Sequence, residues 1–342
     1  MTTLTDRLWY SHRRPLWPLY PLAWLYRTVA EGRRRKAWQV KDEPLPVPVV
    51  VVGNITAGGT GKSPLTARLV ALLKEQGWRP VILSRGYGGR SNDYPLRVKA
   101  ETRAEVAGDE PVMLALETGC PVVVDPQRKR GALWALEHQL GDVLICDDGL
   151  QHYRLPRDIE LVVFDAERGI GNGAGIPVGP LREPLDRLSG VDFVVTNGGT
   201  LEELEHPAQF TMTLEPVELR NLKTGEAASL DCLRNKPVQA IAGIGNPGRF
   251  FATLEALGAR VSATAFADHH KFRASDLQAG GGDWLLMTAK DAVKCRDIAP
   301  DNAWVLSVQA KLPEAFTAAF LARVQECKDS LTTDEPVRAH NG

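Results

Sequence analysis

The chain has 342 residues, enough for about two domains with sizeable cores, and its hydrophobic content of 44% is that of an ordinary globular protein. Its 41 basic and 42 acidic residues nearly cancel, which argues against a general nucleic-acid-binding protein. The five cysteines are odd in number and form no C-x-x-C motif, so the sequence favours a reducing compartment and excludes a disulfide framework or a zinc site.

The first 38 residues combine aromatic rings with basic side chains. Eight basic residues against two acidic ones give this segment a net charge of +6, and 8–38 contains four of the eight tryptophans. Prolines and Arg27 interrupt the apolar run 16–30, which is too short to span a bilayer and lacks a signal-peptide cleavage site. Rings beside clustered arginines are typical of a segment in a membrane interface. The alternative is a helix packed on the protein's own core with a solvated basic end.

A β-branched run at Val49–Val52 predicts a buried parallel strand, which a glycine-rich turn joins to a helix over 65–73. This pattern indicates a phosphate-binding loop, in which Lys62 reaches the β- and γ-phosphates of a nucleotide and Ser63 ligates Mg²⁺. Thr56 stands where the strict motif has its first glycine, and Gly58 and Gly59 could supply the same freedom. The predicted nucleotide ligands are Thr56, Ala57, Gly58, Gly59, Thr60, Gly61, Lys62 and Ser63. A plain turn with a solvated lysine is the alternative.

Two further stretches lie before the middle of the chain. A strand over 80–84 ends in a loop whose Arg85 and Arg90 are candidates for holding phosphate, although such a loop is often merely solvated. Asp109 precedes a helical pattern, and its spacing alone favours a helix N-cap.

Acidic residues end the next apolar strand, over 142–146. Asp147 and Asp148 stand where a P-loop enzyme holds Mg²⁺ opposite its Ser or Thr, and Gln151 and His152 would lie on the same rim. The alternative is an aspartate that caps a turn. A strand over 161–165 then leads into a glycine-rich loop ending near Arg182, which is suited to be a lid or substrate clamp.

The second part of the chain begins near residue 210 and contains several partial motifs. Gly243 to Gly248 fits the dinucleotide pattern G-x-G-x-x-G, but a single match is weak evidence for NAD. His269 and His270 could be a metal pair, yet adjacent side chains on a strand end point apart, so one histidine acting with a carboxylate is favoured. The segment 288–291 is a near miss for a guanine-binding motif and does not support GTP specificity.

Eight ordered motifs together resemble the tetraacyldisaccharide 4′-kinase family, the lipid A kinases of Gram-negative bacteria. The motifs are Gly53 to Pro64, Leu83 to Tyr87, Gly108 to Pro111, Asp147 to His152, Pro180 to Pro184, Gly243 to Pro247, Asp268-His269, and Lys290 to Lys294. The family carries Thr or Ser at position 56, and the G-x-G lookalike falls inside one of its motifs.

The resemblance implies that the γ-phosphoryl group of ATP is transferred to the 4′-hydroxyl of an acylated glucosamine disaccharide 1-phosphate, giving lipid IVA. It places the protein peripherally on the cytoplasmic face of the bacterial inner membrane, with no nucleic acid and no obligate protein partner. ATP and Mg²⁺ are the implied cofactors.

The resemblance also implies residue roles, which replace the helix-cap interpretation of Asp109. Asp109 and His269 form the base, Lys62 and Asp148 act at the reacting phosphate, and Asp147 joins Ser63 and Asp148 around the metal. The implied substrate residues are Arg85, Gln151, His152, Arg182 and Glu183.

The expected fold is α/β, with a P-loop NTPase core whose mostly parallel sheet is flanked by helices, a smaller C-terminal α/β domain and an N-terminal interfacial helix. The expected division is 1–46 for the interfacial segment, 47–210 for the kinase domain, 211–328 for the C-terminal domain and 329–342 for a polar tail. A membrane-associated P-loop ATPase switch is the main alternative function, and an NAD-dependent oxidoreductase a distant third.

Overall fold

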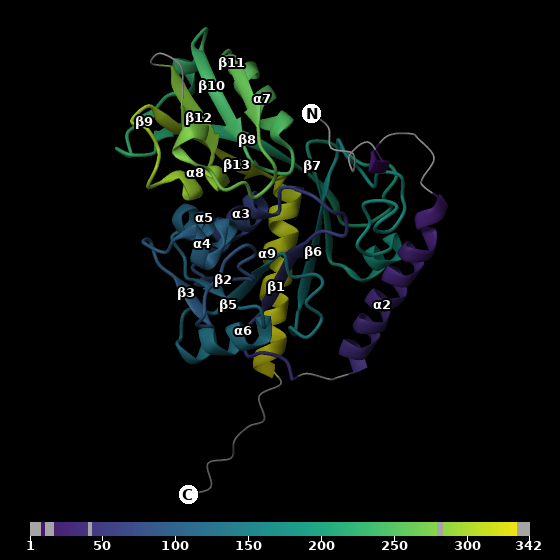
Figure 1. Ribbon diagram of the computed structural model, residues 1–342. Helices are drawn as coiled ribbons and strands as arrows, with labels where there is room; N and C mark the ends of the chain where they lie inside the picture. The colour runs from purple at the N-terminus through teal and green to yellow at the C-terminus, as the bar shows by residue number, and fades with distance from the viewer. Residues whose placement is uncertain (1–7, 11–16, 40–42, 279–282, 334–342) are drawn as a thin grey trace, which may run out of the picture.

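The computed structural model describes residues 8–10, 17–39, 43–278 and 283–333. Parts of the predicted interfacial segment and the end of the polar tail therefore lie outside the described residues. Within them, one continuous sheet joins a larger lobe to a smaller one, as Figure 1 shows. The strands of the larger lobe are β1 (Val49–Gly53), β2 (Pro80–Ser84), β3 (Leu96–Val98), β4 (Val122–Val124), β5 (Val143–Asp147), β6 (Ile159–Asp165) and β7 (Phe193–Asn197). Those of the smaller lobe are β8 (Gln209–Asn221), β9 (Ala227–Ala228), β10 (Pro237–Ala242), β11 (Arg260–Ala265), β12 (Trp284–Thr288) and β13 (Ala303–Lys311).

Helices cover both faces of the sheet and one edge of the larger lobe. They are α2 (Tyr20–Gln39), α3 (Lys62–Glu75), α4 (Ala104–Ala107), α5 (Asp109–Thr118), α6 (Arg128–Glu137), α7 (Pro247–Ala256), α8 (Ala289–Cys295) and α9 (Glu314–Thr333). Short 3-10 turns are η1 (Trp17–Leu19), η2 (Leu185–Gly190), η3 (Leu230–Leu233) and η4 (Ala274–Leu277). None of these described helices is long and apolar enough to cross a bilayer.

The sheet order is β11-β10-β12-β13-β8-β7-β6-β1-β5-β2-β4-β3, with β9 beside β8. Strand β1 lies between β5 and β6 and is parallel to both. Its valines alternate: Val50 and Val52 pack in one core with α3, and Val49 and Val51 in the other with α6. Because both faces of β1 are covered, its unbroken β-branched sequence is what a central parallel strand requires. The carboxyl ends of β1 and β5 therefore meet at the edge where the candidate site lies.

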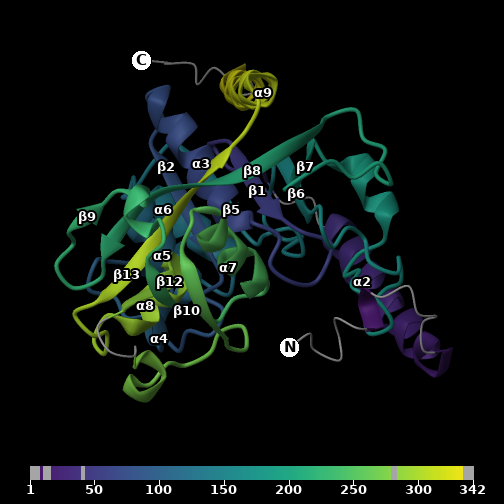
Figure 2. The ribbon, with the colours of Figure 1, turned by 90° about the horizontal axis from the view of Figure 1, so that it is seen from above.

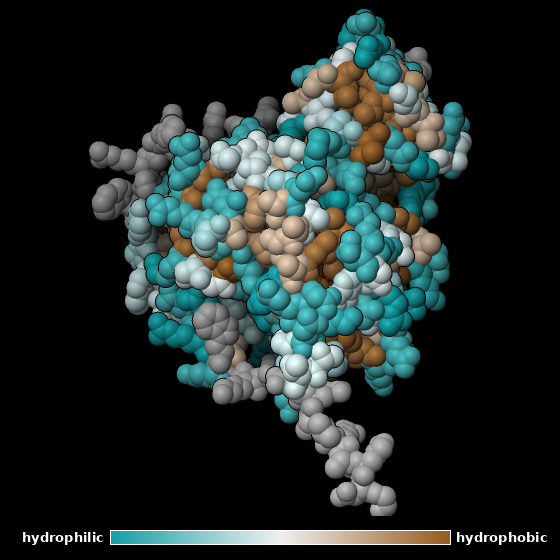
Figure 3. All heavy atoms as spheres, turned by 180° about the vertical axis from the view of Figure 1, so that it is seen from behind, coloured by the Kyte–Doolittle hydropathy of each residue, from teal (hydrophilic) through white to brown (hydrophobic). Residues whose placement is uncertain are grey.

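Strand β8 connects the lobes. It begins parallel to β7 and then pairs antiparallel with β13, with a register shift at Ser307/Val308. Figure 2 shows these two strands as two long ribbons that cross the molecule, with α2 set to one side. The chain returns through α9, whose Phe316 and Phe320 are fully buried in the core of the larger lobe. Seen from behind, the smaller lobe stands above the larger one and shows hydrophobic residues among hydrophilic ones (Figure 3).

Candidate active site

A cleft of about 1650 Å³ lies between the lobes and is lined by the turn after β1, by α5 and by the first turns of α7 and α8. The turn has positive φ at Gly58 (113°) and Gly61 (95°), a backbone that glycine adopts without strain. A Cβ at Gly61 would lie 2.6 Å from Nδ2 of Asn197, which donates a hydrogen bond to the Thr60 carbonyl oxygen at 3.1 Å. The loop is therefore held open as a cradle at the N-terminus of α3.

Threonine is tolerated at position 56, where the strict motif has glycine, because this residue forms an isolated β-bridge and its φ is not positive. Its carbonyl oxygen accepts from Asn54 Nδ2 at 2.6 Å, and its backbone pairs with Leu181. Glycine is needed two residues later, at Gly58, as the sequence suggested for the shifted position. The same Asn54 accepts from Lys62 Nζ at 3.2 Å and so directs the lysine along the cradle.

Asp148 faces the cradle from the end of β5. Its Oδ1 lies 3.5 Å from Lys62 Nζ and 3.8 Å from Arg182 Nη1. Burial opposes its ionisation, but the Lys62 and Arg182 cations outweigh burial and lower the pKa of Asp148. Asp148 is thus a carboxylate with one oxygen, Oδ1, that has no hydrogen-bond partner among the described residues.

Asp147, the preceding residue, is in a different environment. It is 1% exposed, and its Oδ1 accepts a hydrogen bond from Thr66 Oγ1 at 3.0 Å. Burial, followed by the charges of Glu110 and Asp148, raises the pKa of Asp147 to about 7. The two carboxyl groups therefore differ in readiness to ionise, and a divalent cation would favour the anionic form of both.

Asp109 and His269 meet across the cleft. His269 Nδ1 lies 3.1 Å from Asp109 Oδ2, and the His269 ring packs 5.0 Å from that of Tyr87. Helix α5 has Gly108 as its N-cap and no side-chain cap hydrogen bond. The helix-cap interpretation of Asp109 is therefore wrong, because the carboxylate faces the other lobe and not its own helix.

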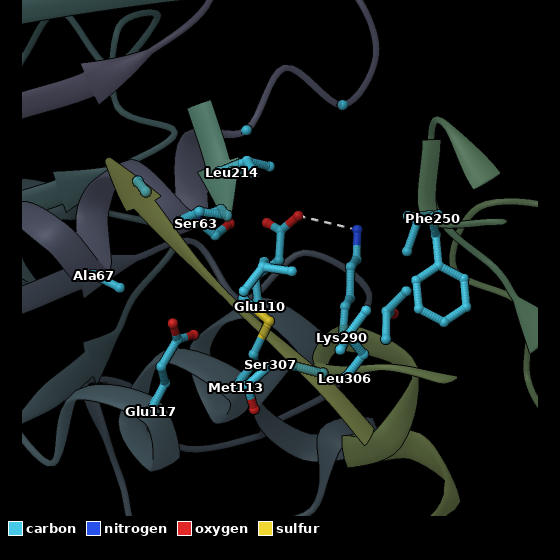
Figure 4. A pocket seen from close by; sticks show the side chains of 18 of the residues that line it. Ser63, Ala67, Glu110, Met113, Glu117, Leu214, Phe250, Lys290, Leu306 and Ser307 are labelled. Carbon is cyan, nitrogen blue, oxygen red and sulfur yellow. Dashed lines mark hydrogen bonds and ion pairs between the residues drawn. The ribbon is translucent and has the colours of Figure 1, made fainter. Parts of the chain in front are cut away.

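The neighbouring histidine has a separate partner. His270 Nε2 lies 3.1 Å from Asp276 Oδ2, so the two adjacent rings point apart, as predicted. The described residues contain no group of three or more His, Cys, Asp or Glu side chains that could hold a metal ion. Beside His269, Lys290 Nζ donates to Glu110 at 3.0 Å and to Asp268 at 3.3 Å; Figure 4 shows Lys290 and Glu110 facing each other in the cleft.

The predicted substrate residues gather on the rim beyond Asp148. Gln151 Nε2 donates to Glu183 Oε1 at 2.7 Å, and Glu183 is buried beside Arg187. Gln151 and Glu183 therefore stabilise the rim of the site. His152 is half-buried, and burial together with the Arg128 and Arg85 charges lowers its pKa to about 4. The imidazole is therefore neutral near pH 7, while the exposed Arg85 supplies positive charge.

Residues 8–10 also reach the cradle, which no local sequence signal indicated. Tyr10 Oη donates to the Ala57 carbonyl oxygen at 3.2 Å, and Trp9 Nε1 donates to the Pro177 carbonyl oxygen at 3.1 Å. Arg168 lies over the Tyr10 ring and donates to the carbonyl oxygen of Gly245 in the smaller lobe at 2.8 Å. The N-terminal segment thus contacts the phosphate loop and the residue that links it to the other lobe.

The model of the family described as tetraacyldisaccharide-1-P 4′-kinase matches residues 15–325. The chain belongs to this family. Its relatives include proteins named tetraacyldisaccharide 4′-kinase from Photobacterium profundum (44% identity; 96% of this chain and 98% of that protein), Alkalilimnicola ehrlichii (49%; 90% and 93%) and Dechloromonas aromatica (49%; 91% and 94%).

A solved member of the tetraacyldisaccharide-1-P 4′-kinase family has the same fold. It is the crystal structure of the apo form of LpxK from Aquifex aeolicus in complex with ATP, with 32% identity and a TM-score of 0.76 over 90% of this chain and 98% of that one. The predicted family resemblance and the P-loop kinase fold are confirmed.

The structure accounts for the two partial motifs of the second part, the G-x-G-x-x-G match and the segment 288–291. Gly245 packs against Gly59, and a Cβ on Gly245 would lie 2.7 Å from the Gly59 nitrogen, so this glycine serves contact between the lobes. Asp291 is fully buried and accepts hydrogen bonds from Gly243 N at 3.0 Å and Thr288 Oγ1 at 2.7 Å. These residues therefore build the smaller lobe and its contact with the cradle.

Proposed function

We propose that the protein is an ATP-dependent kinase that transfers the γ-phosphoryl group to the 4′-hydroxyl of tetraacyldisaccharide 1-phosphate, giving lipid IVA in lipid A biosynthesis. The observation that carries this proposal is the Asp109–His269 pair, in which a carboxylate of the larger lobe meets an imidazole that lines the same cleft as the phosphate cradle. An ATPase needs the cradle and the acidic pair, but it leaves a carboxylate–imidazole pair shared between the lobes without a task. A sugar hydroxyl is a poor nucleophile and needs such a base.

We assign the nucleotide phosphates to residues 56–63, with Lys62 at the β- and γ-phosphates. Mg²⁺ would be held by oxygens of Ser63, Asp147 and Asp148, the ligand type that this hard cation prefers, and would neutralise charge on the phosphates. Oδ1 of Asp148 supports this fit, because in the described chain it accepts no hydrogen bond and has only longer ion-pair contacts with Lys62 and Arg182. Asp109 accepts the proton of the acceptor hydroxyl, with His269 holding its other oxygen, and Lys62 and Arg182 stabilise the charge of the transferred group.

We further propose that Arg85, His152 and Arg182 face the phosphorylated sugar, while Gln151 and Glu183 hold the rim in place. We propose boundaries near 46 and 210 for the kinase domain; the expected boundary at 328 falls inside α9, which packs back into the core of the larger lobe. No role for nucleic acid or for an obligate protein partner is included.

The kinase assay uses γ-labelled ATP with an inner-membrane lipid extract. Label in the lipid fraction supports the kinase, whereas free phosphate without labelled lipid supports the ATPase switch and rejects our proposal. Lys62→Ala should abolish labelling. Asp109→Ala should reduce transfer by about 10²- to 10⁴-fold with ATP affinity nearly unchanged. A near-normal rate of the Asp109 variant would reject the assigned base.

We also propose that α2 docks on the cytoplasmic face of the inner membrane. Large apolar and aromatic side chains are exposed along it: Tyr20, Leu22, Trp24, Leu25, Tyr26 and Val29 are 40–69% exposed. Arg33, Arg34, Arg35 and Lys36 follow on the same helix, where each basic residue near an anionic leaflet adds about 1 kcal/mol of binding. This arrangement favours an interfacial helix over one buried on the protein's own core.

Flotation with anionic phospholipid vesicles tests this docking without deleting residues 8–10. A variant with Leu22, Trp24 and Leu25 changed to Ser should lose most vesicle binding. The matched control changes Leu116 and Leu133 to Ser, two exposed leucines elsewhere on the chain that are 41% and 49% exposed. Equal binding of both variants would reject α2 as the docking element.

A further inference from the structure

A buried lysine of the smaller lobe reaches the candidate base of the larger lobe. Lys294, in α8, has a side chain that is 7% exposed, and its Nζ lies 3.8 Å from Asp109 Oδ2. The same Nζ lies 2.8 Å from Asp291 Oδ1. One ammonium group therefore serves two carboxylates, one from each lobe. At these distances and this burial, its field acts on Asp109 with little screening by water.

The position of Lys294 is fixed from its own lobe. Asp291 is fully buried, and its Oδ2 is occupied by the Gly243 amide and the Thr288 hydroxyl, which leaves Oδ1 for the lysine. On another side the ammonium packs 4.9 Å from the centre of the Phe272 ring. Because Asp291 cannot turn without losing two hydrogen bonds, it aims Lys294 at the lobe interface as a rigid support.

Two side chains of the smaller lobe, His269 and Lys294, contact the same oxygen of Asp109. His269 Nδ1 and Lys294 Nζ both approach Oδ2, and no donor to Oδ1 is found among the described residues. The other charged groups nearby are matched separately, since Lys290 pairs with Glu110 and Asp268. Oδ1 is thus the oxygen left to accept a proton from an incoming hydroxyl.

We infer that Lys294 is a positioning residue for phosphoryl transfer: with His269 it holds Asp109 by Oδ2, and so presents Oδ1 to the acceptor hydroxyl when the lobes are together. This inference rests on the proposed function. Lys294 does not touch the reacting atoms, so it acts on turnover through Asp109. The competing explanation is that Lys294 only neutralises the buried Asp291.

The experiment compares Lys294→Met with Lys294→Arg, and uses Lys311→Met as the matched control. Lys311 also pairs with a carboxylate, Glu215 at 3.0 Å, but is 68% exposed on β13. We expect Lys294→Met to lower kcat for lipid labelling by about 10- to 100-fold, with KM for ATP within about 2-fold. Lys294→Arg should recover most of kcat, because a cation again reaches Oδ2, and Lys311→Met should behave as the unsubstituted protein.

A double-mutant cycle separates positioning from mere support of the fold. In an Asp109→Asn background, Lys294→Met should cost less than about 2-fold further in kcat, because its effect passes through Asp109. An equal loss of kcat in both backgrounds, or a KM increase without a kcat change, overturns the inference. If Lys294→Met does not fold, Lys294→Gln, which can still hydrogen-bond to Asp291, takes its place in the cycle. Failure of the unsubstituted protein to label lipid would overturn the proposed function and this inference together, whereas normal labelling by the Lys294 variants would overturn this inference alone.

Discussion

An ion pair between the lobes offers a direct measure of how strongly they are coupled. Arg249 Nη2 of α7 lies 2.9 Å from Asp165 Oδ1 at the end of β6. Asp165 is 2% exposed, so Arg249→Met would leave a buried carboxylate without its cation. Breaking a fully buried pair in this way costs about 3–5 kcal/mol.

The expected cost here is smaller for two structural reasons. Asp165 Oδ1 keeps hydrogen bonds from the backbone amides of Glu167 at 3.0 Å and Arg168 at 3.3 Å, and the Arg249 side chain is 28% exposed. We therefore expect Arg249→Met to lower the free energy of unfolding by about 1–2 kcal/mol. The double variant with Asp165→Asn should be less destabilised than the sum of its two single variants, by about 1 kcal/mol of coupling.

Urea denaturation followed by tryptophan fluorescence measures these differences. The control is Arg234→Met, whose partner Asp231 lies at 3.0 Å but whose pair is 76% and 75% exposed, so its loss should cost less than about 0.5 kcal/mol. Additive effects of Arg249→Met and Asp165→Asn, within about 0.3 kcal/mol, would refute a direct energetic link between the lobes at this point.

Three other substitutions test the cradle and its surroundings. Gly61→Ala should raise the Kd for ATP at least tenfold in isothermal calorimetry, because φ at this position is 95° and the new Cβ would lie 2.6 Å from Asn197 Nδ2. Its control is Gly77→Ala, where φ is 82° but no atom lies within 4 Å of the new Cβ, and which should leave ATP binding unchanged. Tyr10→Phe removes one hydrogen bond to Ala57, worth about 0.5–1.5 kcal/mol, and should raise the KM for ATP about 2- to 5-fold, with Tyr26→Phe as the neutral control. The pKa of His152 is lowered to about 4 from an ordinary 6.5, so the folded state binds fewer protons than the unfolded state between these values. The free energy of unfolding should be highest above pH 6.5 and fall by about 3 kcal/mol as the pH drops to 4. His152→Gln should flatten that acid limb in thermal melts, and an unchanged limb would count against the neutral imidazole.

The phosphate cradle could be predicted from the sequence because its strand, turn and helix follow one another directly along the chain. The run Val49–Val52 is buried on both faces, and the positive φ values fall on glycines of the following turn. The predicted helix over 65–73 is the interior of α3, which begins earlier, at Lys62. The acidic end of β5 was predictable for the same reason, since a parallel neighbour of β1 must end at the same edge of the sheet.

Contacts between distant segments were beyond reach of local patterns. Spacing alone made Asp109 a helix cap, because the first residues of a helix favour Asp regardless of what faces them. The family resemblance, and not the spacing, pointed to His269. Likewise the sequence predicts that the C-terminal domain begins at 211, whereas one strand, β8, runs from Gln209 to Asn221 and pairs with both β7 and β13. Alternating polar and apolar side chains predict a strand, but they do not predict which other strands it pairs with.

The two halves of the site are therefore built differently, and this has a consequence for the reaction. Lys62, Ser63 and Asp148 all belong to the larger lobe, so we expect nucleotide binding not to depend on the position of the smaller lobe. Within the described residues, both side chains that pair with Asp109, His269 and Lys294, come from the smaller lobe. We expect ATP to bind before the base is organised, and transfer to wait for the lobes to meet around the acceptor. Such an order would limit the hydrolysis of ATP by water, because water that enters an open cleft can reach the phosphates but meets no oriented base there.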